Sequence, residues 1–313
     1  MTAYIIRRLF AVIPVMVVVA LFVFFLLRFA PGDPAAIIAG EDATSDAIAA
    51  VRAKLGLDRP VVEQFAVWVW GLAHGDLGVS IFSNLPVTRL IAQRLEPTLA
   101  LTLSTLVVDI ALAIPIGVIA AWKARTLVDR VVMGFAVLGF AMPGFVLGYV
   151  LIYFFAVQWQ LLPVQGYSPI AEGFWPFVQS LILPSVALGV TYTALIARIT
   201  RASMLDVLQQ DYIRTANAKG LATDRVLLLH ALKNAAVPIV AVIGIGIALL
   251  ISGVVITETV FNIPGLGRLT VDAVLKRDYP IVQGLILVFA AVKVVINLLI
   301  DISYAFLDPR IRY

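Results

Sequence analysis

The sequence contains no cysteine and only two histidines, His74 and His230, among 313 residues. Disulfide frameworks, thiolate zinc sites and cysteine nucleophiles are therefore excluded, and the histidines are too far apart for a local metal-ligand spacing. Charged residues make up only 13% of the chain, about half of what a soluble domain carries. With 62% hydrophobic residues, too few polar side chains remain to cover a water-exposed globule. The sequence indicates an integral membrane protein.

Enzyme motifs are also missing. No segment matches a nucleophile elbow, a zinc-protease helix, a dinucleotide-binding loop or a phosphate-binding P-loop. No apolar stretch carries a nucleophile with a base, or a set of metal ligands. We predict that the chain is not catalytic, holds no cofactor or metal, and does not bind nucleic acid. Any nucleotide that the system uses is then bound by another chain.

Six stretches are apolar over the roughly 20 residues that a helix needs to cross the hydrocarbon core. They are Leu9–Leu27, Pro97–Trp122, Val131–Val157, Phe177–Ala197, Asn234–Thr257 and Ile281–Leu307. The first is longer than the apolar region of a cleaved signal, and no small residue stands at minus three before its end, so we expect it to be retained. The prediction is an all-α polytopic membrane protein with six transmembrane helices.

The orientation follows from the placement of Lys and Arg, which tend to stay on the cytoplasmic side of a membrane. With the N-terminus inside, the inner segments hold thirteen basic and five acidic residues, and the outer segments hold eight basic and twelve acidic residues. Both termini are therefore expected in the cytoplasm.

The remaining sequence divides the chain into three parts. Residues 1–30 form an N-terminal transmembrane helix, residues 31–96 an extracytoplasmic segment, and residues 97–313 a core with five spans. The outer segment has short helical patterns at Ala47–Leu55 and Val62–Leu72. The core contains a cytoplasmic segment, 198–233, and an outer segment, 258–280, which Pro264 and Gly265 punctuate.

The cytoplasmic segment carries a dense run of small and helix-forming residues, DYIRTANAKGL, at 211–221. A Gly at 220 can end one short helix before the next begins at Thr223 or Asp224, which predicts a compact helix–turn–helix. An alternative is an amphipathic segment that lies on the membrane surface, with its basic residues on lipid phosphates.

Residues 212–221, YIRTANAKGL, and 230–238, HALKNAAVP, resemble the cytoplasmic coupling loop of ABC importer permeases of the dipeptide/oligopeptide/nickel branch. The wider importer motif begins Glu-Ala-Ala and places its Gly closer to the Leu-Pro; the peptide/nickel branch shares the departure seen here. Further matches to that branch occur in order along the chain, and they read RFAPGDP (28–34), GDLGVS (75–80), TETVF (257–261), PGLGRL (264–269), RDYP (277–280) and LDPRIRY (307–313).

The resemblance implies a type I ABC importer permease fold in a bacterial cytoplasmic (inner) membrane. It implies a second homologous permease, more often a distinct chain than a copy, and a periplasmic or lipid-anchored substrate-binding protein. Two cytoplasmic ATPases, which hold ATP and Mg, would grip the 211–238 loop. The residues expected in the ATPase groove are Arg214, Thr215, Ala216, Ala218, Lys219, Gly220 and Leu221.

Charged residues inside spans indicate function or pairing, because each is expensive at the bilayer centre unless paired or hydrated. Asp109 and Lys293 are both near the middle of their spans. Lys293, Asn297 and Asp301 recur at i, i+4 and i+8, on one helix face. Two interpretations stay open: a structural pair or buried polar seam, and residues that line the translocation path.

At the outer end of the fifth span, the resemblance implies an outer gate that meets the binding protein. The residues are Glu258, Pro264, Gly265, Gly267 and Arg268. The alternative is a turn that carries a surface acid.

The function predicted is the membrane subunit of an ATP-driven importer of di- or oligopeptides. Importers of the same family for nickel chelates, glutathione or other small solutes are the alternative. An ion-coupled secondary transporter is a third hypothesis, against which stand the absence of an inverted repeat and the coupling-loop match.

Overall fold

The computed structural model describes residues 2–29, 34–39, 43–54 and 56–307, where the regular elements are helices and one isolated bridge joins Val79 to Pro86. The N-terminal helices are α1 (Thr2–Phe29), α2 (Pro34–Ala39), α3 (Ser45–Lys54) and α4 (Val61–Ala73). The long and bent helices that follow are α5 (Val87–Trp122), α6 (Leu127–Ala141), α7 (Gly144–Leu151) with the π-helix η1 (Ile152–Gln158), the short η2 (Ile170–Glu172) and α8 (Phe174–Leu208). The C-terminal helices are α9 (Asp211–Ala218), α10 (Thr223–Arg225), the π-helix η3 (Val226–Leu232), α11 (Lys233–Val260), α12 (Leu266–Lys276) and α13 (Tyr279–Leu307).

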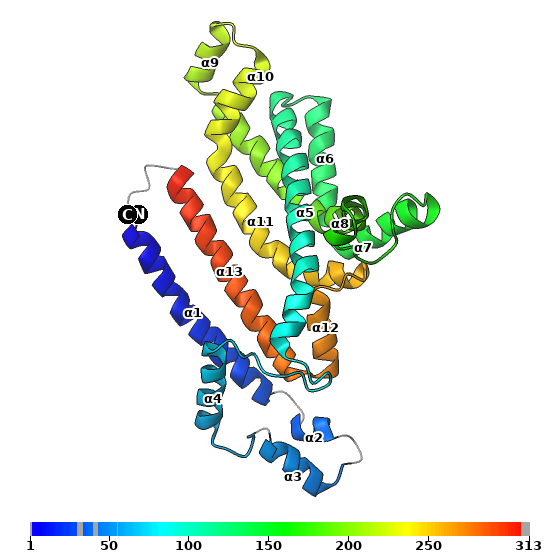
Figure 1. Ribbon diagram of the computed structural model, residues 1–313. Coiled ribbons are helices and arrows are strands. Elements are labelled where there is room, and N and C mark those ends of the chain that lie inside the picture. Colours follow the sequence, from blue (N-terminus) through cyan, green and yellow to red (C-terminus); the bar gives the residue numbers. More distant parts are fainter. Residues whose placement is uncertain (1, 30–33, 40–42, 55, 308–313) are drawn as a thin grey trace. The chain divides into compact units, whose positions relative to one another are not determined.

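The chain divides into two compact units. The first combines Met1–Ile5, Glu96–Arg268 and Lys293–Tyr313, and the second combines Ile6–Leu95 and Leu269–Val292. The long helices α8 and α11 and most of α5 belong to the first unit, together with α9 and α10, which lie beyond one end of them (Figure 1).

Four helices of the described chain are long and apolar enough to cross a membrane, and a fifth is added if the bent pair of α6 with α7 and η1 is one span. The four are in α5, in α8, in Thr223–Ile251 and in Tyr279–Ile300. The first predicted span lies in α1, whose described apolar part, Phe10–Phe25, is shorter than this criterion requires. The count of six and the cytoplasmic termini remain predictions.

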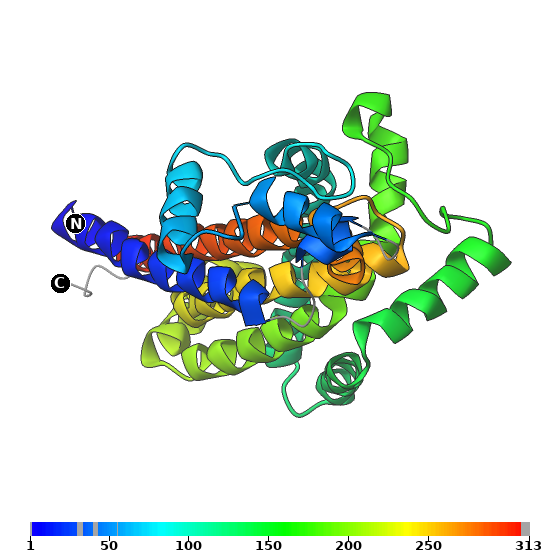
Figure 2. The ribbon, with the colours of Figure 1, turned by 90° about the horizontal axis from the view of Figure 1, so that it is seen from below.

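The expectation of one continuous helix over Val131–Val157 is wrong. The two helices α6 and α7 meet at 105° around Met142 and Pro143, and the bend is visible in Figure 2. Pro143 has no N–H, and its ring drives the residue before it out of the helical region, where Met142 adopts φ −87° and ψ 125°. Periodicity over 27 apolar residues does not reveal such a break.

The outer elements agree with the sequence in one place and differ in another. The helical patterns at Ala47–Leu55 and Val62–Leu72 correspond to α3 and α4, with Leu55 outside the described residues. The segment 258–280 is more regular than its Pro and Gly suggest, because it contains helix α12, the last residues of α11 and the first residues of α13. The last motif, at 307–313, lies outside the described residues apart from Leu307.

In the first unit, α8 is the helix against which its neighbours pack. A Cβ added at Gly117 of α5 would lie 2.6 Å from Cβ of Thr200, and one at Gly253 of α11 would lie 2.8 Å from Cδ1 of Leu188. Small residues at these crossings let backbones approach closely, which is how helices gain packing energy in lipid.

Candidate functional site

The coupling segment has the helix–turn–helix form predicted. Helix α9 ends at Ala218, and Gly220 follows with φ +77°, a left-handed conformation that favours glycine after a helix end. Its N–H donates to the carbonyl of Asn217 at 2.9 Å. Helix α10 then begins at Thr223, as the sequence predicts.

One face of α9 is packed into the protein. Ile213 and Ala216 are 2% and 7% exposed, and they join a hydrophobic cluster with Met204 of α8 and Val226 of η3. At 100° per residue, the opposite face of the helix carries Arg214, Thr215 and Ala218, together with Asp211. The packing therefore fixes which side of α9 points outward.

This packing corrects part of the predicted contact set. Ala216 is buried against the chain's own core, so it holds the segment in place instead of facing a partner. Leu221 is half-buried and packs on the same cluster, which leaves only part of its surface open. The members that remain exposed are Arg214, Thr215, Ala218, Lys219 and Gly220.

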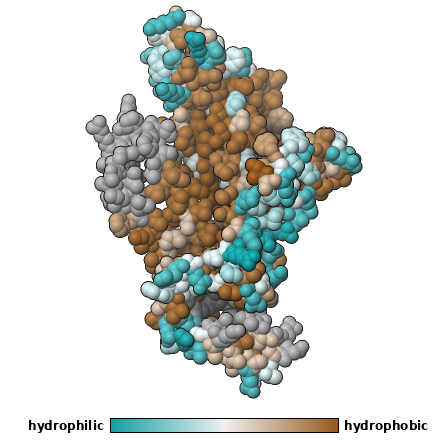
Figure 3. All heavy atoms as spheres, in the orientation of Figure 1, coloured by the Kyte–Doolittle hydropathy of each residue, from teal (hydrophilic) through white to brown (hydrophobic). Residues whose placement is uncertain are grey.

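The exposed face of α9 is polar, which bears on the membrane-surface alternative. An interfacial helix needs an exposed apolar face, whereas the apolar Ile213 and Ala216 of α9 are both buried in protein. In η3, by contrast, Leu228 and Leu229 are exposed, so the argument against the alternative applies to α9. Figure 3 shows hydrophilic residues gathered over α9 and α10, while the long helices beside them are mainly hydrophobic. Asp211 and Arg214 form an ion pair of 3.3 Å with both side chains more than 70% exposed, so the pair adds little stability.

At the other end of α11, Glu258 is completely buried. The hydroxyl of Thr98 donates to its Oε1 at 2.5 Å, and the backbone N–H of Arg268 donates to its Oε2 at 3.0 Å. The Thr98 hydroxyl also accepts the N–H of Leu266 at 2.8 Å. Since Leu266 and Arg268 are in the first turn of α12, these two side chains satisfy N–H groups that a helix start leaves unpaired.

The interpretation of Glu258 as a surface acid is therefore wrong. Gly265 and Gly267 are buried beside it: a Cβ at Gly265 would collide with the carboxylate. Of the predicted gate residues, Pro264 is exposed and Arg268 is half-buried, with its Nη1 donating to Oδ1 of Asn262. Only these two of the five have surface to offer a binding protein in this conformation.

The loop between η1 and α8 is attached to the same region. Gly166 N–H donates to the carbonyl of Phe261 at 2.9 Å, and the hydroxyl of Tyr167 donates to Oε1 of Glu96 at 3.0 Å. Burial, and then the hydrogen bond and charge of Glu96, raise the pKa of Tyr167 above its ordinary value. Tyr167 therefore remains a protonated donor at any physiological pH.

Of the two interpretations left open for the charges within the spans, the structure does not form a pair between Asp109 and Lys293. Asp109 is 1% exposed and accepts the Thr193 hydroxyl at 2.7 Å on Oδ1, while its Oδ2 has no hydrogen-bond partner among the described residues. Lys293 and Asn297 are exposed, so they do not form a buried seam within this chain. The side chain of Asp301 is outside the described residues.

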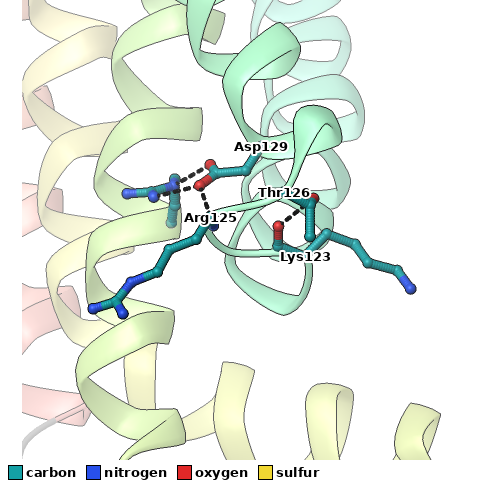
Figure 4. A network of polar contacts seen from close by, with 5 residues as sticks. Lys123, Arg125, Thr126 and Asp129 are labelled. Atoms are coloured by element: carbon teal, nitrogen blue, oxygen red, sulfur yellow. Dashed lines mark hydrogen bonds and ion pairs between the residues drawn. The ribbon is translucent and has the colours of Figure 1, made fainter.

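A polar contact that the sequence analysis missed joins α6 to α8. Asp129 is 4% exposed, and Arg201 binds it with two hydrogen bonds, Nε to Oδ1 at 2.6 Å and Nη2 to Oδ2 at 2.7 Å. The backbone N–H of Arg125 donates to Oδ2 at 2.9 Å. Figure 4 shows Asp129 against the tight loop that carries Lys123, Arg125 and Thr126. The only signal in the sequence was one acid among the basic residues of an inner segment.

Long apolar helices packed through small residues, with a short helical element that turns a polar face outward at one end, define a polytopic helical membrane protein. The chain belongs to the family of binding-protein-dependent transport system inner membrane components, which residues 113–313 match. Residues 1–102 match the N-terminal membrane component of such systems.

Curated relatives extend over the full chain. A probable peptide ABC transporter permease protein, y4tP, of Sinorhizobium fredii is 52% identical, covering 100% of both chains. The dipeptide transport system permease protein DppB of Escherichia coli K12 is 41% identical, covering 100% of this chain and 99% of its own length. A putative peptide transport system permease protein of Brucella abortus is 43% identical over 100% of both chains.

Solved structures confirm the predicted fold. A structure of inward-facing conformations of the MetNI methionine ABC transporter matches with a TM-score of 0.57 and 18% identity, covering 70% of this chain and 96% of that chain. A crystal structure of an amino acid ABC transporter with histidines matches with a TM-score of 0.52 and 16% identity, covering 70% and 94%. The fold is that of a type I ABC importer permease.

Proposed function

We propose that this chain is a membrane-spanning, non-catalytic subunit of an ATP-driven importer of di- or oligopeptides in a bacterial cytoplasmic membrane. The observation that carries the proposal is the construction of α9, which buries Ile213 and Ala216 and turns Arg214, Thr215 and Ala218 outward. Peptide as the substrate class is supported by the names of the full-length relatives.

The coupling role rests on rigidity. Because α9 shares a hydrophobic cluster with α8 and η3, a force applied to its outer face is carried into two long helices instead of bending a loose loop. ATP-driven closure of two ATPases would displace α9 as a rigid body and tilt α8 and α11. The ATP and Mg belong to the partner ATPases, and the exposed set from Arg214 to Gly220 supplies this chain's half of the contact.

On the outer side, α12 is the element proposed to meet the binding protein. Glu258 and Thr98 hold its first turn to the ends of α11 and α5, so the outer gate would move with these helices. A second homologous permease, more often a distinct chain, would complete the pathway. We propose that Asp109 supports the fold of one permease and that Lys293 and Asn297 face the pathway or the partner permease.

The test is copurification of the ATPases with the chain from membranes that contain the whole transporter. Ala218→Trp places a bulky side chain on the outward face of α9 and leaves its buried face intact. The control is Ala50→Trp, at an exposed alanine of α3. We expect Ala218→Trp alone to reduce the amount of ATPase recovered.

Two results would contradict the proposal. If no ATPase copurifies with the unchanged chain, and the chain alone moves tritiated Ala-Ala into liposomes, the ion-coupled alternative takes its place. If ATPases copurify equally with both variants, the outward face of α9 is not the contact.

A further inference from the structure

We propose that the Asp129–Arg201 ion pair carries the movement of the coupling segment into α6, so that both residues are positioning residues for energy coupling. The inference rests on the proposed function, since it takes the ATPases to act on α9. It concerns a connection between helices that neither the coupling motif nor the outer gate includes.

The first observation is the burial pattern of α6. Its apolar residues at the start of the helix are open, with Leu127 75% exposed, Val128 45% and Val131 48%, while the charged Asp129 is the buried residue of this helix. Because α6 buries its acid and exposes its leucine and valines here, a polar contact attaches this end of the helix to the protein. The attachment is the paired hydrogen bonds from Arg201.

The second observation is the loop that precedes α6. Arg125 has φ +65°, a left-handed conformation that is strained for a residue with a side chain. Its N–H donates to the same carboxylate, and the Thr126 hydroxyl donates to the carbonyl of Lys123 at 2.6 Å (Figure 4). The turn between α5 and α6 is thus built around Asp129, and whatever moves Asp129 moves the turn.

The third observation is where Arg201 lies on α8. Met204, three residues further along, is completely buried and packs in the cluster that holds Ile213 and Ala216 of α9. Residues three apart are neighbours on a helix surface. A displacement of α9 therefore acts on α8 at Met204, within one turn of Arg201, which binds α6.

The fourth observation is a close approach of α6 and α8 at the other end of α6. A Cβ added at Gly139 would lie 3.1 Å from Cγ2 of Val190, eleven residues before Arg201 and about 16 Å along the helix. Beyond it the chain breaks at Pro143 into α7. With contacts near both of its ends, α6 moves with α8 as a rigid body and displaces the bend at Pro143. When the ion pair is lost, the cytoplasmic end of α6 no longer follows α8.

The experiment uses the assembled transporter in lipid nanodiscs, with its binding protein loaded with Ala-Ala. Asp129→Asn weakens the pair without changing its size, and Arg201→Lys keeps the charge but cannot make the paired contact. The control is Arg59→Lys with Glu63→Gln, which removes an exposed ion pair of 3.1 Å in the outer segment. The measurements are ATP hydrolysis without and with loaded binding protein, and recovery of the ATPases.

We expect Asp129→Asn to keep assembly and unstimulated hydrolysis but to lose about five-fold or more of the stimulation by binding protein, the scale of an ordinary coupling free energy. Arg201→Lys should lose less, and the control should behave as the unchanged transporter. A merely structural pair would lower both rates together.

Three outcomes overturn the inference. The first is unaltered stimulation in both variants, and the second is a proportional fall of both rates. The third is failure of both variants to assemble, which would show that the pair serves folding only. An unchanged transporter that shows no ATPase activity would contradict the proposed function instead, and the two failures are thereby distinguished.

Discussion

The hydroxyl of Thr98 lies 2.5 Å from Oε1 of Glu258, across 160 residues of sequence, and accepts the N–H of Leu266 at the same time. One side chain on α5 therefore binds both the end of α11 and the start of α12. Thr98, Glu258 and the glycines around them form a cluster, here called the outer cluster. Loss of the Thr98 hydroxyl oxygen alone would weaken it.

Thr98→Val removes that hydroxyl and keeps the shape of the side chain. The buried Glu258 loses one donor and the N–H of Leu266 loses one acceptor, so we expect a loss of about 1–3 kcal/mol of stability. The effect is measured as the melting temperature in detergent, with the folded fraction at each temperature determined by size-exclusion chromatography. Thr98→Ser keeps the hydroxyl and should stay close to the unchanged chain; equal melting of the Val and Ser variants would contradict the assignment.

Gly265→Ala places a methyl group on the Glu258 carboxylate, which hydrogen bonds from Thr98 and Arg268 hold in place. We expect a loss of about 1–3 kcal/mol from overpacking. The matched control is Gly134→Ala in α6, where an added Cβ meets nothing within 4 Å. Alanine is the better helix former by about 1 kcal/mol, so the control should be neutral or slightly more stable. The same unfolding assay compares them, and similar losses in both would be evidence against the tight outer cluster.

Asp109→Asn separates the two interpretations of the charges within the spans. Asn keeps an oxygen for the Thr193 hydroxyl and removes a charge whose second oxygen has no partner in the described part of the chain. If Asp109 supports the fold, uptake of tritiated Ala-Ala stays within about two-fold of the unchanged transporter, because the hydrogen bond from Thr193, a contribution of about 1 kcal/mol, is preserved. Asp109→Ala, which removes the acceptor, should lower the melting temperature. A strong loss of uptake in the Asn variant would show that the charge itself takes part in transport.

Arg125→Gly should stabilise the chain. Arg125 has φ +65°, where a side chain is unfavourable by about 1–2 kcal/mol and glycine is not, and the N–H that binds Asp129 is retained. Arg130→Gly, inside α6, should have the opposite sign, because glycine weakens a helix by about 1 kcal/mol. A lower melting temperature for Arg125→Gly would mean that its side chain contributes more than its conformation costs.

Much of the fold and of the coupling segment was accessible from local sequence. Apolar length located the long helices, and Gly220 located the end of α9, because helix ends and span lengths depend on neighbouring residues only. The bend at Pro143 was missed because a proline in an apolar run does not by itself predict a break, since α5, α8 and α11 each contain a proline and stay helical. Helix α8 extends beyond the predicted span Phe177–Ala197, since it continues eleven residues past Ala197 as an amphipathic helix that buries Thr200 and Met204.

The sequence by itself determined that this is a helical membrane protein, and its motifs determined the family, because composition and short-range order decide both. Only the tertiary structure decided that Ala216 faces inward, that Glu258 is buried and that Asp129 meets Arg201. Each of these depends on which residues distant in the chain come together, and the penalty for burying a carboxylate without partners makes that choice specific. A residue's type shows that it needs a partner, but only packing across the fold supplies one.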